Sequence, residues 1–471
     1  MTQTSIDIRC YCHGLGDCML LRFTKEDGSP FWMLIDCGIH SAAANGGNIM
    51  RTVVDNIAEL VGRRIDVVVG THEHIDHNSA FLQAKAKFKG LDVGEVWFSW
   101  AENPADPDAR KLDRFKADAA SALAGSALHL SASKDRLETA KVIDGLLGFV
   151  FGVKGERVRE ARETLRGLSS TVRHFEPGTR TALPGVPGVR VYVLGPPRDP
   201  KLLGIENILS ETYALGASTA GIAPLANALR IHDATLRVDQ DLSAPFDGHE
   251  GLVLEPLLAG KWPADGKIAH FFWDHYLGPD KSSSEALCQQ WRRIDNDWLG
   301  SAVDLALQLD GRTNNTSLVL AFELVDSGKV LLFAADAQIG NWMSWDQVTF
   351  DAGADGPATT VDALLRRTVF YKVGHHGSGN ATRKVALEKM DRTNLVAFSP
   401  TDESLASRIG WKEVPAPNTN ERIAELTAGR FIRSDAAWIK DPNTPVPIRP
   451  SGALKRIERD PQGLFVDITI G

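Results

Sequence analysis

The sequence predicts a layered α/β protein. Short apolar runs that end at glycine or at a polar residue are typical of β-strands, and here they alternate with longer segments of helical periodicity. Aspartate or histidine stands directly after several of these runs. Since α/β folds carry their chemistry in loops at strand ends, the sequence also predicts a functional site at one edge of the strands.

The first part of the chain predicts mainly strands. Glycine-containing turns, among them Gly14-Leu15-Gly16-Asp17 and Asp36-Cys37-Gly38, separate the apolar runs. Residues 48–60 have the periodicity of an amphipathic helix. The expected strands are 6–11, 19–23, 31–35, 65–69 and 96–98.

The middle of the chain has a different composition. Residues 105–172 are charged and rich in alanine and leucine, with helical periodicity at 139–147 and 156–168, so we expect a helical insertion. Strands return at 189–194, 317–324, 329–333, 369–373 and 395–399, and a helix is expected at 419–426. The predicted organisation is a first half of the fold at 1–104, a helical insertion at 105–175, a return strand at 176–199, a second insertion at 200–312 and a second half at 313–471.

Composition narrows the function classes. The chain has 471 residues, 43% of them hydrophobic, and a net charge of −8, so no chain-wide positive field is available to hold a polyanion. Four of the five cysteines lie in the first forty residues, and we expect reduced thiols rather than a disulfide framework. Neither a signal peptide nor a long apolar span is apparent, so we expect a cytoplasmic protein without membrane contact.

The motif His72-x-His74-x-Asp76-His77 carries most of the chemistry. It places four metal-binding side chains within six residues, directly after an expected strand. Imidazole and carboxylate are ligands for zinc, iron or manganese, so the motif predicts a metal site. Two later strands end in Asp336 and in His375-His376, and these residues are expected to join the same site.

The chain resembles the metallo-β-lactamase superfamily, and within it the hydrolase domain of the ComEC-like DNA-uptake competence proteins. The resemblance rests on the order of Asp36, the histidine motif, Asp336 and His375, each after a strand, and covers roughly residues 5–100, 176–197 and 313–436. The motifs that carry it are Gly14-Leu15-Gly16-Asp17, Leu34-Ile35-Asp36-Cys37-Gly38, Asn314-Asn315-Thr316-Ser317-Leu318-Val319 and Lys372-Val373-Gly374-His375-His376-Gly377-Ser378.

The resemblance implies a four-layer αββα sandwich with two large, partly helical insertions, and one or two divalent ions, zinc being expected and manganese the alternative. One ion would bind His72 and His74, the other Asp76, His77 and His375, with Asp336 bridging and Asp36 orienting the loop from behind. Catalysis by a metal-bound hydroxide would involve Asp76, Asp336 and His376. Most of the superfamily supplies a third histidine to the first ion where this chain has Asn314-Asn315-Thr316.

Three functions stay open on the sequence. The first is hydrolysis of a phosphodiester in nucleic acid or a nucleotide, with Ser378, Asn380 and Asn315 binding the substrate. The second is hydrolysis of a small ester, lactone or thioester, which the negative net charge favours. The third is partner binding through the insertions, with a structural metal site. His275, in the aromatic stretch 270–275, is a further candidate ligand delivered from the second insertion.

Overall fold

The computed structural model describes residues 5–131, 156–205, 208, 210–211, 266–278, 309–353, 356–411 and 413–471. It divides into two compact units. The first comprises Met1–Ala117, Leu146–Ser218 and Leu307–Gly471, and the second Asp118–Gly145 and Thr219–Ala306. Each expected insertion therefore contributes to both units. The expected helix at 139–147 lies outside the described residues.

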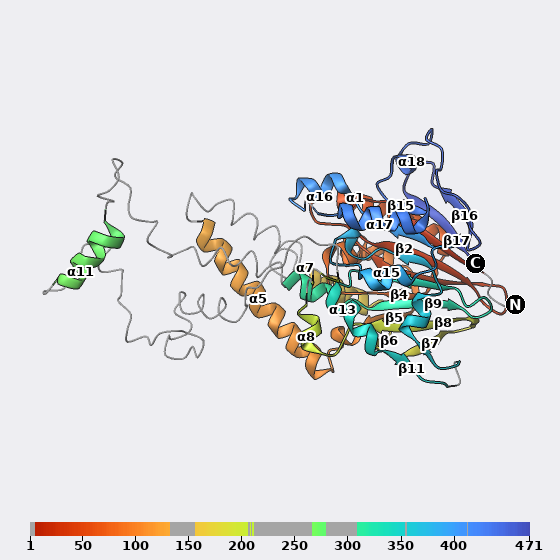
Figure 1. Ribbon diagram of the computed structural model, residues 1–471, viewed down its shortest axis with the longest axis horizontal. Helices are drawn as coiled ribbons and strands as arrows, with labels where there is room; N and C mark the ends of the chain where they lie inside the picture. Colours follow the sequence, from red (N-terminus) through yellow and green to blue (C-terminus); the bar gives the residue numbers. More distant parts are fainter. Residues whose placement is uncertain are drawn as a thin grey trace. The chain divides into compact units, whose positions relative to one another are not determined.

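The first unit contains two large mixed sheets (Figure 1). One is eight-stranded, in the order β16 (Leu454–Arg459), β17 (Phe465–Ile470), β1 (Ile6–Tyr11), β2 (Cys18–Thr24), β3 (Pro30–Cys37), β4 (Arg64–Val69), β5 (Asp92–Ser99) and β6 (Val172–Phe175). The other is seven-stranded, in the order β15 (Phe431–Arg433), β14 (Val396–Ser399), β13 (Thr368–Lys372), β10 (Val330–Phe333), β9 (Val319–Leu324), β8 (Val186–Gly195) and β7 (Arg180–Leu183). The expected strands are thereby confirmed, whereas β6, β7, β15 and the C-terminal pair β16–β17 were not predicted.

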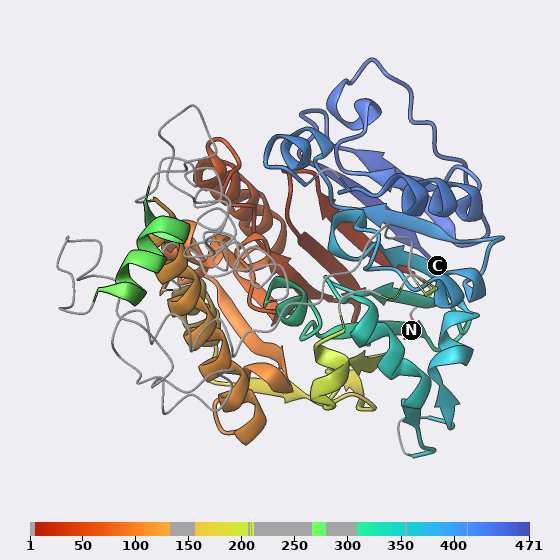
Figure 2. The ribbon, with the colours of Figure 1, turned by 60° about the vertical axis from the view of Figure 1, so that its left-hand side comes forward.

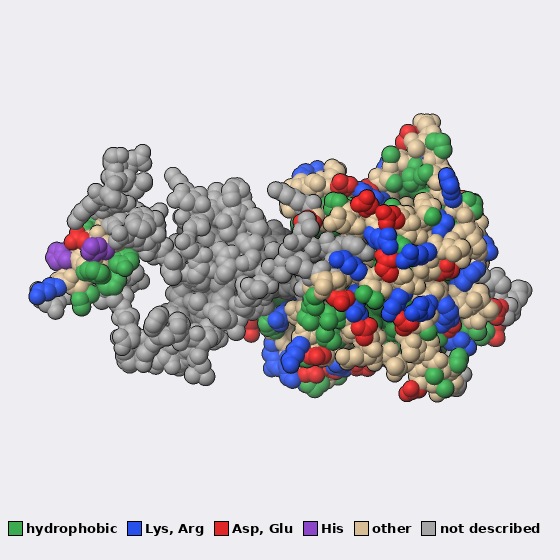
Figure 3. All heavy atoms as spheres, in the orientation of Figure 1, with side chains coloured by type: hydrophobic (Ala, Val, Ile, Leu, Met, Phe, Trp, Pro, Cys, Tyr) green, Lys and Arg blue, Asp and Glu red, His purple; other side chains and the backbone are tan. Residues whose placement is uncertain are grey.

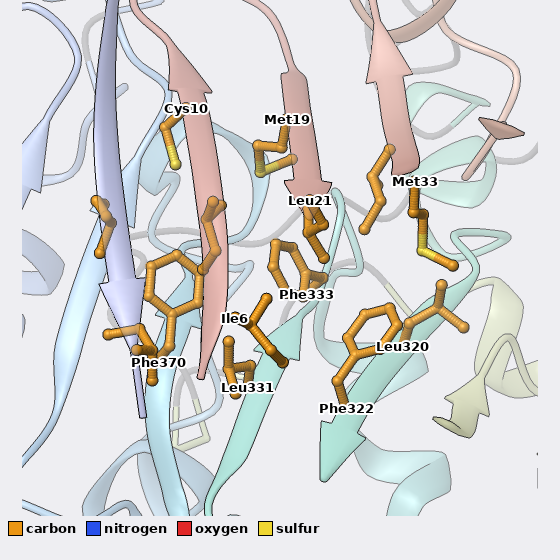
Figure 4. Packing of buried hydrophobic residues seen from close by; sticks show 14 of the residues in the cluster. Ile6, Cys10, Met19, Leu21, Met33, Leu320, Phe322, Leu331, Phe333 and Phe370 are labelled. Atoms are coloured by element: carbon orange, nitrogen blue, oxygen red, sulfur yellow. The ribbon is translucent and has the colours of Figure 1, made fainter. Parts of the chain in front are cut away.

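The main core lies between the two sheets. Alternate side chains of each strand point into it, as in Met19, Leu21 and Met33 from one sheet and Leu320 and Phe322 from the other. Figure 4 shows these side chains meeting face to face. Both inner faces are apolar, so the sheets bury each other and fix their relative position.

Helices cover the outer faces of the two sheets (Figure 2). The residues that alternate with the core, such as Leu20 and Leu34, pack on α1 (Gly46–Val61), α3 (Ala80–Gln83), α4 (Lys85–Phe88) and α7 (Glu156–Arg166). The second sheet packs on α13 (Ile339–Ser344), α14 (Val361–Leu365), α15 (Lys384–Lys389) and α17 (Pro417–Thr427). The fold class is thus mixed α/β, with the layers in the order helices, sheet, sheet, helices. The remaining helices of this unit include α2 (Ile75–Asn78), α8 (Pro200–Leu203), α16 (Glu403–Arg408) and α18 (Ala437–Lys440).

In the second unit the structure describes α11 (Lys267–Phe272) and the π-helical turn Trp273–Leu277. The helix α5 (Pro107–Ser131) carries residues of both units. No helix in the described part of the chain has the length and apolar content needed to cross a bilayer.

Candidate metal centre

The expected ligand residues meet at one edge of the two sheets. Asp36 belongs to the end of β3, and the segment His72–His77, here called the histidine loop, begins three residues after the end of the parallel neighbour β4. In the other sheet Asp336 and His375 follow the parallel neighbours β10 and β13. The backbone N–H of Leu318, at the start of β9, donates to the carbonyl of Thr71 at 2.8 Å and joins the two edges. Parallel strands place their carboxyl ends together, which brings these distant residues to one place.

Two glycine motifs hold the histidine loop at this edge. A Cβ atom on Gly16 would lie 2.4 Å from the Gly38 carbonyl oxygen, and one on Gly38 would lie 2.4 Å from the Asp76 carbonyl carbon. Both positions therefore require glycine. The close approach lets the Asp17 N–H donate to the Asp76 carbonyl at 3.0 Å and the Gly38 N–H to the Asp17 carbonyl at 3.0 Å. This packing fixes the backbone of Asp76 and His77.

Asp36 forms hydrogen bonds to Thr71, directly before the histidine loop, and to His77. Its Oδ1 accepts from the Thr71 N–H at 2.8 Å, and its Oδ2 accepts from Thr71 Oγ1 at 2.7 Å and from His77 Nδ1 at 2.8 Å. A carboxylate accepts only, so His77 carries its proton on Nδ1 and leaves a lone pair on Nε2. Because the Thr71 hydroxyl proton goes to Asp36, the hydroxyl oxygen accepts from His72 Nδ1 at 3.1 Å, which leaves a lone pair on His72 Nε2.

The buried side chains of two histidines and two aspartates, His77, His376, Asp76 and Asp336, converge in front of Asp36. His77 Nε2 lies 3.0 Å from Asp336 Oδ2 and 3.9 Å from Asp76 Oδ2. His376 Nε2 lies 2.7 Å from Asp76 Oδ2 and 3.7 Å from Asp336 Oδ2. The Nδ1 of His376 donates to the Pro400 carbonyl at 2.7 Å, so its Nε2 also presents a lone pair to these carboxylates. A group formed by Asp17, His77, Asp336 and His376 lies close enough together to hold a metal ion.

The charges around this group also require a cation. Asp17, Asp36, Asp76 and Asp336 are all fully buried, and Lys372 places one buried ammonium among them, 2.5 Å from Asp17 Oδ2 and 3.3 Å from Asp336 Oδ1. Burial opposes the charge of Lys372, but Asp17 and Asp336 outweigh it and raise its pKa. Buried negative charge is costly unless it is paired, so the surplus must be balanced by protonated histidine or by metal ions.

The pKa values of the buried histidines are shifted in two opposite directions. Burial lowers the pKa of His77 and of His376, but the facing aspartates, Asp336 first, outweigh burial and raise both pKa values. For His72 and His74 burial dominates, with the neighbouring His77 adding to it for His72, and the pKa of His74 falls to about 3. The shifts therefore favour the neutral form of His72 and His74 and the protonated form of His77 and His376 in the absence of metal.

His72 and His74 form a second pair of facing nitrogens. His72 Nε2 lies 3.0 Å from His74 Nδ1, and both rings are buried. Glu73, between them, is anchored by Lys116 Nζ of α5 at 3.2 Å and by Arg162 Nη1 of α7 at 3.3 Å. Arg162 also pairs with Glu102 at 3.0 Å. The helices α5 and α7 of the first insertion thus brace the histidine loop through buried ion pairs.

Backbone strain is concentrated at the same place. Asp36, Ala335, His375 and His376 all have positive φ, at 54°, 48°, 43° and 54°. Non-glycine residues seldom adopt this conformation, and they persist in it where surrounding contacts enforce it, commonly at functional sites.

The structure separates the two adjacent histidines of the last motif. His376 enters the four-residue group, whereas His375 is directed toward Gln338, with 3.3 Å between His375 Nδ1 and Gln338 Nε2. Burial lowers the pKa of His375 to about 4. The sequence assigned His375 to the metal and His376 to catalysis, whereas the described group that lies close enough to hold an ion includes His376 and not His375.

The expected substrate-binding residues Ser378, Asn380 and Asn315 form hydrogen bonds with one another or with neighbouring segments. Ser378 Oγ donates to Asn380 Oδ1 at 2.8 Å. Asn315 Nδ2 donates to the Ile205 carbonyl at 2.7 Å, and its Oδ1 accepts from the Asn341 N–H at 3.0 Å, so its amide holds neighbouring segments together. His275 lies in the second unit, where its ring packs 4.7 Å from that of Phe271.

Asp17 and Lys372 were not assigned roles from the sequence. Both stand in motifs that carry the resemblance, Asp17 after Gly14-Leu15-Gly16 and Lys372 at the end of an apolar strand. A lysine in register with buried strand residues is itself a signal, because lysine is seldom fully buried without a charged partner.

A scan of the sequence against protein-family models finds no match, and neither does a search of curated proteins.

Proposed function

We propose that this protein is a metal-dependent hydrolase with the metallo-β-lactamase fold, acting on a phosphodiester. The observation that carries the proposal is the convergence of the His77 and His376 Nε2 lone pairs on two buried carboxylates, Asp76 and Asp336. In a neutral state these acceptors would repel one another. A cation among them would satisfy all four, and nitrogen and carboxylate oxygen are ligands that suit zinc or manganese.

The open polar atoms support hydrolysis over a purely structural ion. Asp76 Oδ1 and His375 Nε2 are buried and have no hydrogen-bond partner among the described residues. Asp76 Oδ1 would accept a proton from an attacking water, and His375 Nε2 would contact the group that leaves. A bound divalent ion would lower the pKa of water to about 7 and so supply hydroxide at neutral pH. Asp36 and Lys372 would keep the ligands and their charges in place.

The choice of a phosphodiester rests on the ComEC-like motifs. The distribution of charge bears on the size of the substrate. Basic and acidic side chains are interspersed on the face shown in Figure 3. Together with the net charge of −8, this distribution favours a small substrate such as a nucleotide over a long polyanion. Hydrolysis of a small ester, lactone or thioester is the second candidate, favoured by the same charge.

The test combines metal analysis with a substrate screen. We expect purified protein to contain zinc or manganese and to hydrolyse an activated phosphodiester faster than an activated ester or thioester. Asp76→Ala and His77→Ala should lose both metal and turnover while remaining folded, since these residues lie in a loop at strand ends. Normal metal content and turnover in either variant would refute the assignment, and metal without any turnover would favour a structural role.

A further inference from the structure

The two nitrogens of His74 have different partners. Nδ1 faces His72 Nε2 at 3.0 Å, and Nε2 lies 3.6 Å from Asp310 Oδ1. Asp310 belongs to a helical segment, 309–314, that begins within the last residues of the second insertion and is far from the histidine loop in sequence. Its side chain is buried beside His74.

At 3.6 Å the contact is longer than a hydrogen bond, and it acts through charge. A carboxylate beside Nε2 favours the tautomer of His74 that has the proton on Nε2 and the lone pair on Nδ1. The Asp36–Thr71 chain leaves the lone pair of His72 on Nε2. The two lone pairs then face each other 3.0 Å apart, an arrangement that a cation between or in front of them would stabilise.

Asp310 also has a fixed position and a charge. Asn314 Nδ2 donates to Asp310 Oδ2 at 3.1 Å, so the first residue of Asn314-Asn315-Thr316, the stretch that stands where most of the superfamily supplies a third histidine, holds the carboxylate. His72 and His74 are neutral ligands, and a dication bound to them needs negative charge nearby.

We infer that Asp310 is a positioning residue of the metal centre, which orients His74 for an ion bound by His72 and His74 and supplies negative charge to it. The inference rests on the proposed function. It explains how this position can bind a cation without a third histidine. It also assigns to Asp310, rather than to His275, the contribution made by the region of the second insertion.

The test uses Asp310→Asn and Asp310→Ala in the full chain, with metal analysis and titration calorimetry of zinc and manganese. A matched control is Asp66→Asn, because Asp66 is 7% exposed against 9% for Asp310 and is bound by Lys25 at 2.9 Å. We expect two ions in the unaltered protein and in the control. In the Asp310 variants one ion should bind about 10- to 100-fold more weakly and the other unchanged. Asp310→Glu should restore part of the loss.

Each other outcome has a definite meaning. Unchanged affinity for every ion in Asp310→Asn, or equal weakening of both ions, would overturn the inference and leave the proposed function intact. An unaltered protein that binds no divalent ion would overturn both. Thermal unfolding separates loss of metal from loss of fold, and Asp310→Asn, which keeps the shape of the side chain, decides if Asp310→Ala does not fold.

Discussion

Asp36→Asn tests the hydrogen-bond network behind the metal ligands. The carboxylate accepts three hydrogen bonds, from the Thr71 N–H, the Thr71 hydroxyl and His77 Nδ1. An amide offers one oxygen and one NH₂ group, so at least one buried donor must face another donor. Leaving such a donor unsatisfied costs about 1–3 kcal/mol, and the remaining bonds lose the assistance of the charge. We expect metal-free Asp36→Asn to be about 3 kcal/mol less stable than the unaltered protein.

Metal binding gives the same substitution a second, independent magnitude. His77 loses the partner that fixes its proton on Nδ1, and such losses weaken metal affinity by about 10- to 100-fold. With saturating metal the stability difference should therefore grow by about 1.4–2.7 kcal/mol. Urea unfolding with and without metal, together with calorimetric titration, measures both effects.

Asp66→Asn is the control for this prediction. Asp66 is also buried and accepts three hydrogen bonds, from Lys25, Trp32 and Arg64, at 2.9, 2.9 and 3.2 Å. Its substitution should reduce stability without changing metal affinity. If Asp36→Asn behaves in the same way, with normal metal affinity, the orienting role of Asp36 is wrong.

Three further predictions follow from the buried charges. Lys372→Met leaves Asp17 and Asp336 without their ammonium partner, so the free energy of unfolding of the metal-free protein in urea should fall by about 3–5 kcal/mol. Added metal should then raise the stability of this variant by more than it raises that of the unaltered protein. Arg162→Met leaves Glu73 and Glu102 buried without their guanidinium partner and should lower the free energy of unfolding by about 3–5 kcal/mol. Arg157→Met, on the exposed face of α7, is the control and should change it by less than about 0.5 kcal/mol. Equal effects of the two substitutions would contradict the bracing of the histidine loop. The aspartates raise the pKa values of His77 and His376, which favours their protonated forms without metal. Metal binding should therefore release protons and tighten as pH rises. Calorimetry in buffers of different ionisation enthalpy that detects no release would refute this.

Much of the fold could be predicted because its strands are locally distinct. The runs at β1, β4 and β9 are short, apolar and bounded by turns, which is the pattern a buried strand requires. The C-terminal strand β17 alternates buried with half-buried residues, and its place beside β1 depends on pairing across the whole chain, for example Ile6 with Ile470. Such long-range pairing leaves no local signal.

The candidate site was predictable to the extent that its residues lie in motifs. Six consecutive residues contain His72, His74, Asp76 and His77, and strands precede Asp336 and His376. Asp310 stands in no motif, and its contact with His74 arises only from folding. The order of His375 and His376 could not be settled from sequence, because the positive φ of both residues turns their side chains in directions that spacing does not reveal.

The most direct test of the metal centre is anomalous diffraction from crystals grown with zinc or manganese. We expect a peak about 2.0–2.2 Å from His77 Nε2, His376 Nε2 and carboxylate oxygens of Asp76 and Asp336. A second, weaker peak should lie against His72 Nε2 and His74 Nδ1. Absence of any peak at these residues, or coordination of the first ion by His375 in place of His376, would contradict it.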